Sequence, residues 1–280
     1  MTLATSTVRR RRWPVQPAAA LLAVLVLLGI PFAVVILTAG KSKAEALEPN
    51  LALPSSWHYL ENFAQVLSEG RMLAAFLGSV LVMVPAVAIV LVFGAMASWI
   101  LARRKSLLIS LVYAAGISGI VLPPAVVTVV LLLQMIGLDG TAIGMICVYS
   151  GMYMSTVIFF VTGFVRTIPP SLEEAARIDG ASPTGVFGRI ILPVLTPTLA
   201  TATILICLYI WNDVFYALFV IGGRIDTLPL NLYQVASSGL YLHNWHLIFA
   251  YIILMSLPLL VTFVLMQRKI ISGITSGAVK

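Results

Sequence analysis

Charged residues are scarce in this chain. Asp, Glu, Lys and Arg together make up 10% of its 280 residues, whereas a typical soluble protein carries about 25%. Apolar residues make up 60%, and the mean hydropathy is +1.06. A soluble fold needs charge to cover its surface, so this shortage excludes an ordinary soluble domain. We expect lipid to cover much of the folded chain.

Cysteine is nearly absent as well, and no residues have the spacing of a metal site. Cys147 and Cys207 both lie inside apolar stretches, without a CxxC pair or a Cys/His cluster. We interpret them as small buried side chains. The net charge of +7 comes from basic residues in short runs between apolar stretches. That arrangement is typical of membrane topology and argues against nucleic-acid binding, which needs basic residues gathered on one face.

The sequence also lacks an ATP site and a catalytic set. Gly40-Lys41-Ser42 resembles the end of a phosphate-binding loop, but Val35 stands where that motif requires a glycine. No nucleophile, base or metal ligands converge as a membrane-embedded enzyme would require. We therefore expect a protein that is not an enzyme and binds no cofactor of its own.

Six long apolar stretches are present instead. Crossing about 30 Å of hydrocarbon takes about 20 apolar residues in a helix, and lipid offers no partner for an open strand edge. The sequence thus predicts an all-α, polytopic membrane protein with six transmembrane helices. Pro123 and Pro124 should bend or break the third stretch. The predicted spans are roughly Ala18–Ala39, Leu73–Leu101, Leu107–Leu133, Ile143–Phe164, Thr198–Ile221 and Leu247–Met266.

The distribution of Lys and Arg along the chain predicts that both termini face the cytoplasm. The first stretch is longer than the 7–15 residues of a signal-peptide core, so we expect it to be retained. With the N-terminus inside, the basic residues divide unequally, as the positive-inside rule requires. The outside segments carry only Lys41, Lys43, Arg71 and Arg224. The inside segments carry Arg9 to Arg12, Arg103, Arg104, Lys105, Arg166, Arg177, Arg189, Arg268, Lys269 and Lys280.

The cytoplasmic loop Ile168–Pro197 has clear helix signals. Ser171, with Glu174 three residues later, forms a capping box that predicts a helix start. Gly180 suits the left-handed conformation that ends a helix. The first helix would present a small apolar face built from Leu172, Ala175 and Ala176. Such a face favours docking into a partner, although a stable linker without a partner has the same local pattern.

A second short helix should follow in the same loop. Ser182 can cap it, and Pro183 suits its first turn. We expect this helix to run to about Leu192, where Pro193 would end it. Outside the membrane, 57–67 has the pattern of a short amphipathic helix lying at the interface.

Two groups of motifs carry a family resemblance. Glu174-Ala175-Ala176-Arg177-Ile178-Asp179-Gly180-Ala181, followed by Ile190-Ile191-Leu192-Pro193 and Pro197, resembles the EAA loop of binding-protein-dependent ABC importer permeases. Trp211-Asn212-Asp213, Thr227-Leu228-Pro229-Leu230 and the end of the chain resemble the maltose-type carbohydrate subfamily, of the MalG type. The resemblance covers nearly the whole chain from about Trp57. The chain departs from it at Gly78-Ser79, at Arg103-Arg104-Lys105-Ser106 and at its end, where similar sequences often have one further glycine.

The resemblance implies a type I ABC importer permease fold in the bacterial cytoplasmic membrane. It implies a second permease subunit (MalF-like), two ATP-binding subunits that use ATP and Mg, and an extracytoplasmic solute-binding protein or lipoprotein. The domains would be a cytoplasmic segment at 1–17, a first transmembrane helix at 18–39, an external loop at 40–72, a permease core at 73–267 that contains the EAA coupling loop at 168–197, and a cytoplasmic tail at 268–280.

The resemblance also implies how energy reaches the membrane. The EAA helix would insert into a cleft on the ATPase, and the tail would reach between the ATPase subunits. We expect Glu173, Glu174 and Asp179 to be exposed acids, and the tail to be extended and closely packed. The implied ATPase-coupling residues are Glu173, Glu174, Ala175, Ala176, Asp179, Gly180 and Ala181, and the implied tail contacts are Gly273, Ser276 and Gly277.

Asp213 is the acid that falls inside a predicted span. An ionisable group there is costly and should face a cavity or a partner. With Trp211 and Asn212 it offers an aromatic plate and hydrogen-bonding groups that suit a sugar, and Tyr153 would line the same path. Asp213 would equally well cap a helix break or pair with the second permease subunit.

The substrate stays open between a sugar, a related polyol and glycerol phosphate. A secondary transporter driven by an ion gradient is the alternative class. It should place several acids in the membrane, or a pair of broken helices in inverted repeats. The single membrane acid and the absence of an evident repeat argue against it.

Overall fold

The computed structural model describes residues 15–121, 125–237 and 243–278, and those residues form helices and loops without a β-strand. In chain order the α-helices are α1 (Val15–Val24), α2 (Ile30–Ala39), α3 (Tyr59–Glu69), α4 (Met72–Arg103), α5 (Leu107–Ser118), α6 (Val126–Met135), α7 (Ala142–Val165), α8 (Ser171–Ile178), α9 (Pro183–Val186), α10 (Leu192–Trp211), α11 (Leu228–Ser237) and α12 (Trp245–Ala278). Short π-helical segments occur at η1 (Leu25–Gly29), η2 (Phe187–Ile191) and η3 (Ala217–Ile221).

Five helical segments of the described chain are long and apolar enough to cross a bilayer. They are Pro17–Ala39, Met72–Arg103, Ala142–Val165, Pro183–Trp211 and Trp245–Leu265. The third predicted span is instead two short helices, α5 and α6. Pro123 and Pro124 lie outside the described residues, but α5 ends before them and α6 begins after them, as a helix break there requires.

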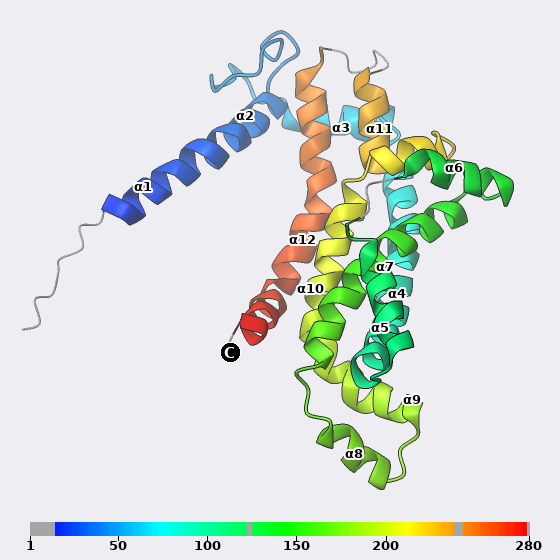
Figure 1. The fold of residues 1–280 in the computed structure, drawn as a ribbon. Helices are drawn as coiled ribbons and strands as arrows, with labels where there is room; N and C mark the ends of the chain where they lie inside the picture. The colour runs from blue at the N-terminus through cyan, green and yellow to red at the C-terminus, as the bar shows by residue number, and fades with distance from the viewer. Residues whose placement is uncertain (1–14, 122–124, 238–242, 279–280) are drawn as a thin grey trace, which may run out of the picture.

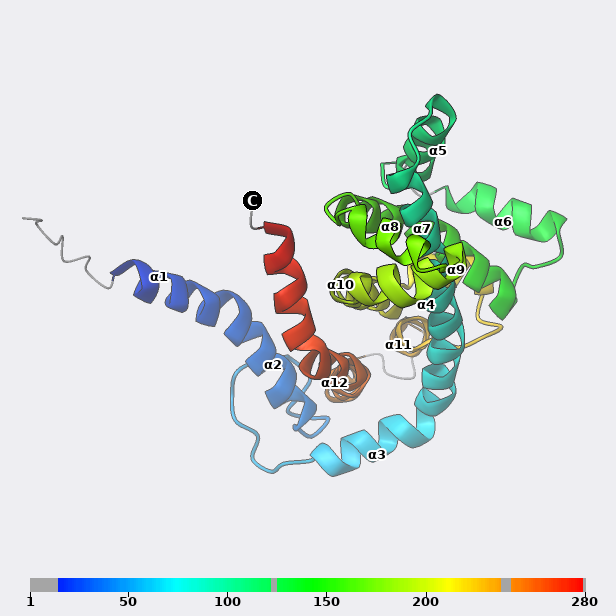
Figure 2. The ribbon, with the colours of Figure 1, turned by 90° about the horizontal axis from the view of Figure 1, so that it is seen from below.

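Helices α4, α7, α10 and α12 form the body of the molecule (Figure 1). Helix α4 packs along α7, α10 packs against both, and α12 packs on α10 and on α2. Seen from below, α5 and α6 stand on one side of this body and α1 on the other (Figure 2). The residues of α1 and α2 that face outward are mostly apolar, as a lipid-covered surface requires.

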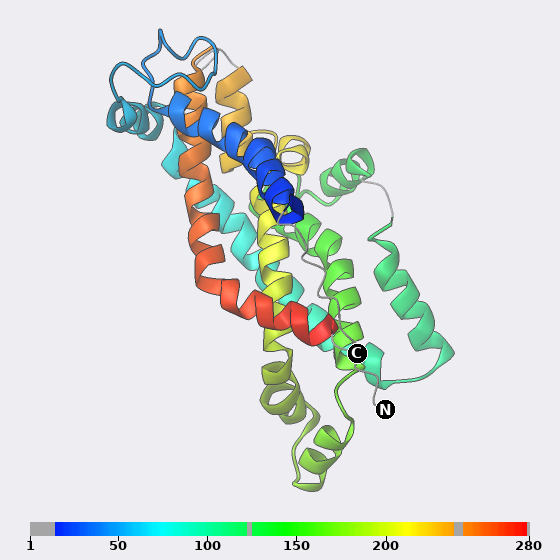
Figure 3. The ribbon, with the colours of Figure 1, turned by 90° about the vertical axis from the view of Figure 1, so that its left-hand side faces the viewer.

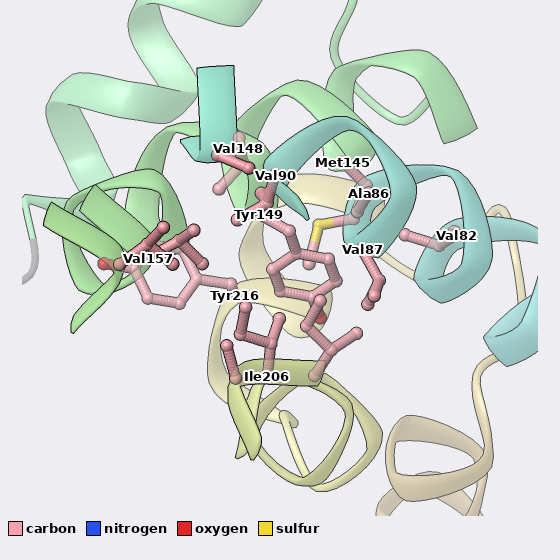
Figure 4. Packing of buried hydrophobic residues seen from close by; sticks show 14 of the residues in the cluster. Val82, Ala86, Val87, Val90, Met145, Val148, Tyr149, Val157, Ile206 and Tyr216 are labelled. Atoms are coloured by element: carbon pink, nitrogen blue, oxygen red, sulfur yellow. The ribbon is translucent and has the colours of Figure 1, made fainter. Parts of the chain in front are cut away.

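Aliphatic side chains and small residues close the interface between α4, α7 and α10. Val82 and Val90 from α4, Met145 from α7 and Ile206 from α10 are buried together (Figure 4). Gly94 lets α4 approach α7 closely, because a Cβ at this position would lie 2.6 Å from Cγ1 of Val157. Between helices in lipid, dispersion contacts of this kind and close backbone approach supply the packing free energy.

The cysteines differ from their expected environment. Both are free, and Cys147 on α7 is exposed, although we expected it to be buried. It lines a cavity between α7 and the α5–α6 pair. Cys207 on α10 is half-buried.

The bundle has two chemically different ends. Of the basic residues predicted to be inside, Arg103 to Lys105 and Arg166 lie where α4 and α7 end, and the other described ones lie on α8, η2 and α12. Arg9 to Arg12 and Lys280 lie outside the described residues. The residues predicted to be outside lie near α2, α3 and α11 (Figure 3). Helices α8 and α9 project beyond the bundle at the first end (Figure 1). The fold therefore separates the two sets of basic residues as the charge rule predicts.

The amphipathic helix at the outer end is confirmed as α3. The side chain of Asn62 on α3 donates hydrogen bonds to the carbonyls of Ala39 (2.9 Å) and Lys41 (3.0 Å), which ties α3 to the end of α2. Trp57 stacks on Tyr59 with ring centroids 5.4 Å apart. In the preceding loop, hydrogen bonds from Ser55 and then from Ser42 lower the pKa of the Glu45 carboxyl to about 2.

Helix α11 is anchored to α4 at one of the places where the sequence departs from its relatives. Ser79 Oγ accepts a hydrogen bond from the backbone N–H of Leu228 at 2.8 Å. At Gly78 the carbonyl oxygen of Asp226 occupies the space that a Cβ would need. Glycine here is therefore a packing requirement of the segment that leads into α11.

Candidate coupling loop and candidate substrate path

The first helix of the loop, α8, begins without the predicted capping box. Its N-cap is Pro170, which has helical φ and ψ, and no side chain caps it. The backbone N–H groups of Glu173 and Glu174 already donate to the carbonyl of Pro170, at 2.9 and 3.1 Å. Ser171 therefore lies inside the first turn and cannot act as the cap, so that prediction is wrong.

The end of α8 and the start of α9 follow the prediction. Gly180 has a φ of +82°, the left-handed conformation expected of it. The N–H of Ala181 donates to the carbonyl of Ala176 at 2.9 Å, which closes the helix end. Ser182 Oγ then accepts from the N–H of Gly185 at 3.2 Å, and Pro183 occupies the first turn of α9.

The second helix of the loop does not stop at Pro193. Helix α9 continues through η2 into α10, so residues from Pro183 to Trp211 form one continuous helical rod. The π-helical turn η2 precedes Pro193 and changes the hydrogen-bond register, which lets the helix pass a residue that lacks an N–H. The loop and the span α10 are therefore joined without a break in the helix.

Glu173 is buried, which corrects its expected exposure. The residue as a whole is 3% exposed, and Oε1 accepts from Arg103 Nε at 2.6 Å. Arg103 Nη2 also donates to the carbonyl of Ile168 at 2.9 Å, while Arg177 reaches Glu173 Oε2 at 3.5 Å. Glu173 thus binds α8 to the end of α4 and is not available to a partner.

The opposite face of α8 is exposed. Glu174, Ala175 and Asp179 are exposed, and Ile178 has 86% of its surface accessible. Ala176 is half-buried and packs against the core. The loop therefore presents small, apolar and acidic groups at the tip of the projection. The buried ion pair between Glu173 and Arg103 holds the opposite face of α8 against the bundle.

The predicted tail is helical. Helix α12 continues to Ala278 and contains Gly273, Ser276 and Gly277, so the expected extended tail is wrong for the described residues. Glycine lowers helix propensity but does not forbid a helix when the flanking residues favour one.

Asp213 lies at a break in the fifth predicted span, because α10 ends at Trp211. Asp213 Oδ1 accepts from the N–H of Tyr216 at 3.3 Å, and Oδ2 accepts from the N–H of Ala217 at 3.1 Å. Tyr149 Oη also donates to Oδ2 at 2.8 Å. Both carboxylate oxygens are therefore used by the chain itself, which is the helix-capping alternative considered from the sequence.

The structure gathers tyrosines beside Asp213. Tyr153 stacks on Tyr209 with centroids 5.8 Å apart, and it also contacts Tyr149 with centroids 6.2 Å apart. Tyr153 and Tyr216 line a cavity of about 590 Å³ between α7 and the α5–α6 pair. No local sequence pattern indicates this cavity, since it depends on the position of α6 against α7.

The structure does not bring Trp211 into this group. Its ring is 3% exposed and packs edge-on against Phe76, and the indole N–H donates to the carbonyl of Met255 at 3.0 Å. Asn212 is exposed, and its amide donates to the carbonyl of Leu208 at 2.8 Å. Of the residues predicted for the path, Tyr153 and Asp213 thus share one neighbourhood, through Tyr149.

A sequence profile of the family described as binding-protein-dependent transport system inner membrane component matches residues 70–276. The chain belongs to this family. It is therefore a multi-pass inner-membrane permease component of an importer and not an enzyme. The matched range includes the coupling loop, the break at Asp213 and α12.

Similar proteins match the permease over most of its length. It is 32% identical over 263 residues to the melibiose/raffinose/stachyose import permease protein MelC of Bacillus subtilis, covering 90% of this chain and 91% of MelC. It is 30% identical over 275 residues to the diacetylchitobiose uptake system permease protein NgcG of Streptomyces coelicolor, covering 95% and 89%. A chain of a bacterial ABC transporter that imports alginate shares its fold, with a TM-score of 0.78 at 18% identity over 96% of this chain and 99% of that one.

Proposed function

We propose that this permease carries a sugar or a related polyol inward across the cytoplasmic membrane, driven by ATP hydrolysis on separate subunits. Its relatives include permeases named for melibiose, raffinose and stachyose, for diacetylchitobiose and for multiple sugars. Their substrates share a polyhydroxylated surface, which tyrosine rings and amide groups suit. The partners are a second permease subunit, two ATP-binding subunits and an extracytoplasmic binding protein or lipoprotein.

The exposed face of α8 carries the proposal for coupling. Ile178 is 86% exposed at the tip of a projection, and Leu172 and Ala175 on the same short helix are exposed as well, so α8 offers apolar surface that a partner could cover. Insertion of this face into an ATPase cleft would cover Ile178 and Ala175 and bring Glu174 and Asp179 close to the partner. Because α9 and α10 form one rod, closure of the ATPase pair would tilt α10 and alter the path beside it.

For the substrate path, we propose that Tyr153 and Tyr209 face the solute and that Asp213 positions them through Tyr149. Asp213 holds the start of η3 and the Tyr149 hydroxyl, so its contribution is positional. Helix α12 would place Gly273, Ser276 and Gly277 next to the ATPase subunits, as a helix instead of an extended segment.

Substitution of the coupling loop tests the proposal in cells that carry the intact importer. Glu174→Arg and Gly180→Val should lower uptake of the transported sugar at least tenfold, while the amount of protein in the membrane is unchanged. Glu48→Arg makes the same charge change on an exposed residue of the external loop and should leave uptake unchanged. Normal uptake with either loop variant would contradict the coupling role of α8.

The substrate class is tested separately by comparing labelled melibiose, raffinose, diacetylchitobiose and glycerol 3-phosphate in cells with and without the permease. We expect at least one of the three sugars to require it. A requirement for glycerol 3-phosphate alone would contradict the sugar assignment and leave the coupling proposal standing.

A further inference from the structure

A basic cavity opens beside the coupling loop, and neither the coupling role nor the substrate path uses it. It lies between the α4–α5 connection and the end of α7, with a volume of about 550 Å³. Its polar lining consists of Arg103, Arg104, Lys105, Ser106, Ser110, Tyr113 and Arg166. None of the described residues that line it is acidic.

Most of the positive charge in this cavity is uncompensated. Arg103 is paired with Glu173 behind the cavity. Arg104 and Lys105 are exposed, and neither forms an ion pair within the described chain. Arg166 lies over the ring of Tyr113, 5.0 Å from its centroid, and likewise has no carboxylate partner among the described residues. Three unpaired cations, Arg104, Lys105 and Arg166, thus line one cavity, and their combined positive potential favours binding of an anion.

The start of α5 adds to this positive potential. Ser106 is the N-cap of this 12-residue helix, and its Oγ accepts from the N–H of Ile109 at 3.2 Å. The other N–H groups of the first turn lack intrahelical partners, and the helix dipole places positive charge at this end. An anionic oxygen in the cavity would therefore meet backbone donors as well as side-chain cations.

The first turns of α5 also present an apolar surface beside the cavity, outside its lining. Leu107, Leu108 and Leu111 lie on α5 and are 79%, 70% and 59% exposed. A free phosphate would gain nothing from these side chains, whereas an amphiphile would place its acyl chains along them. The cavity also lies at the end of the span α4, the level at which lipid headgroups are found.

We propose that this cavity binds the phosphate headgroup of an anionic phospholipid, with Arg104, Lys105 and Arg166 as its ligands and α5 as the surface for its acyl chains. Arg103 shares the cavity wall and holds Glu173 of α8, so the bound lipid lies next to the anchor of the coupling loop. The site is independent of which solute the permease carries.

Lipid binding to the purified full-length permease in detergent tests the proposal. The probes are phosphatidylglycerol, phosphatidylcholine, deacylated glycerophosphoglycerol and inorganic phosphate, with bound molecules counted by native mass spectrometry. We expect phosphatidylglycerol to bind at least tenfold more tightly than phosphatidylcholine. Each cation removed in Arg104→Gln, Lys105→Gln or Arg166→Gln should weaken it about fivefold. Arg189→Gln removes a cation from the same end of the bundle, outside the cavity, and should leave binding unchanged.

Three results would overturn the assignment. Equal binding of phosphatidylglycerol and phosphatidylcholine would show that charge does not select the ligand. Equal binding of glycerophosphoglycerol or inorganic phosphate would make this a site for soluble phosphate esters. Loss of the bound lipid when the ATPase subunits are added would assign the basic residues to a protein interface. Lys105 is exposed and forms no hydrogen bond or ion pair with the described residues, so Lys105→Gln reports on binding even if the arginine variants unfold.

Discussion

Arg103 Nε and Glu173 Oε1 lie 2.6 Å apart, and they connect the end of α4 to α8 across 70 positions of the sequence. The side chain of Glu173 is 4% exposed and that of Arg103 is 17% exposed. A hydrogen bond from Arg103 to the carbonyl of Ile168 completes the anchor. The pair fixes the inner face of α8 and so leaves the outer face, with Ile178 at its tip, free to contact a partner.

Glu173→Gln should loosen α8 without removing it from the structure. Breaking a buried ion pair leaves one charge uncompensated and costs about 3 kcal/mol. Hydrogen exchange of the amides at 171–179 should therefore become faster in this variant. Glu174→Gln alters the adjacent, exposed acid and serves as the matched control, with exchange expected to match the parent protein. Equal exchange in all three proteins would contradict the anchoring role.

Gly180 is required for its backbone conformation, since nothing lies within 4 Å of the place where its Cβ would be. Its φ of +82° costs a residue with a side chain about 1–2 kcal/mol, and asparagine less. We expect uptake to fall in the order glycine, asparagine, alanine at this position. Gly188→Ala also adds a Cβ in open space, without the positive φ, and should behave as the parent. A Gly180→Ala variant with parental uptake would contradict this explanation.

Asp213 should support transport because its carboxylate oxygens accept hydrogen bonds from the chain, and not because the group is charged. Asp213→Ala removes the cap of the turn at 214–221, a loss of about 1 kcal/mol, and should reduce uptake at least tenfold. Asparagine keeps an acceptor oxygen, so Asp213→Asn should retain more than half of the uptake. Tyr149→Phe deletes only the hydroxyl bond and should resemble the asparagine variant. If asparagine fails as badly as alanine, the carboxylate contacts the solute.

Gly78→Ala should destabilise the outer end of the bundle. The added methyl would collide with the carbonyl oxygen of Asp226, and overpacking of this kind costs about 1–3 kcal/mol. The apparent melting temperature in detergent should fall. Gly151→Ala on α7 has nothing within 4 Å of its new Cβ and should melt with the parent. Unchanged melting of Gly78→Ala would mean that the segment before α11 moves aside freely.

Composition and local signals were enough to predict the first, second, fourth and sixth spans, the amphipathic helix α3, the left-handed Gly180 and the cap at Ser182, because each depends on residues near in sequence. The misses have a different origin. Whether Glu173 is buried depends on Arg103, which lies 70 positions away. Its spacing of three from the half-buried Ala176 would have placed it on the inner face, had the orientation of α8 been known.

Two further predictions, for Pro193 and Ser171, were wrong because neighbouring residues change the effect of a local sequence signal. Pro193 stops an isolated helix, but the π-helical turn η2 just before it lets the rod continue into α10. Ser171 has the capping sequence, but Pro170 already supplies the first helical carbonyl. The tyrosine group at Asp213 and the basic cavity both form between elements, so no single segment indicates them.

The central claim is that the exposed tip of α8 docks onto an ATPase. Site-specific crosslinking in the intact importer tests it directly, with Cys147 and Cys207 replaced by serine and a single cysteine at Ile178→Cys. The account predicts a crosslinked product with the ATP-binding subunit whose yield changes when ATP is added, and none from Leu111→Cys on α5, which is also exposed. Absence of that product, or labelling of the position 178 cysteine only from outside the cell, would contradict it.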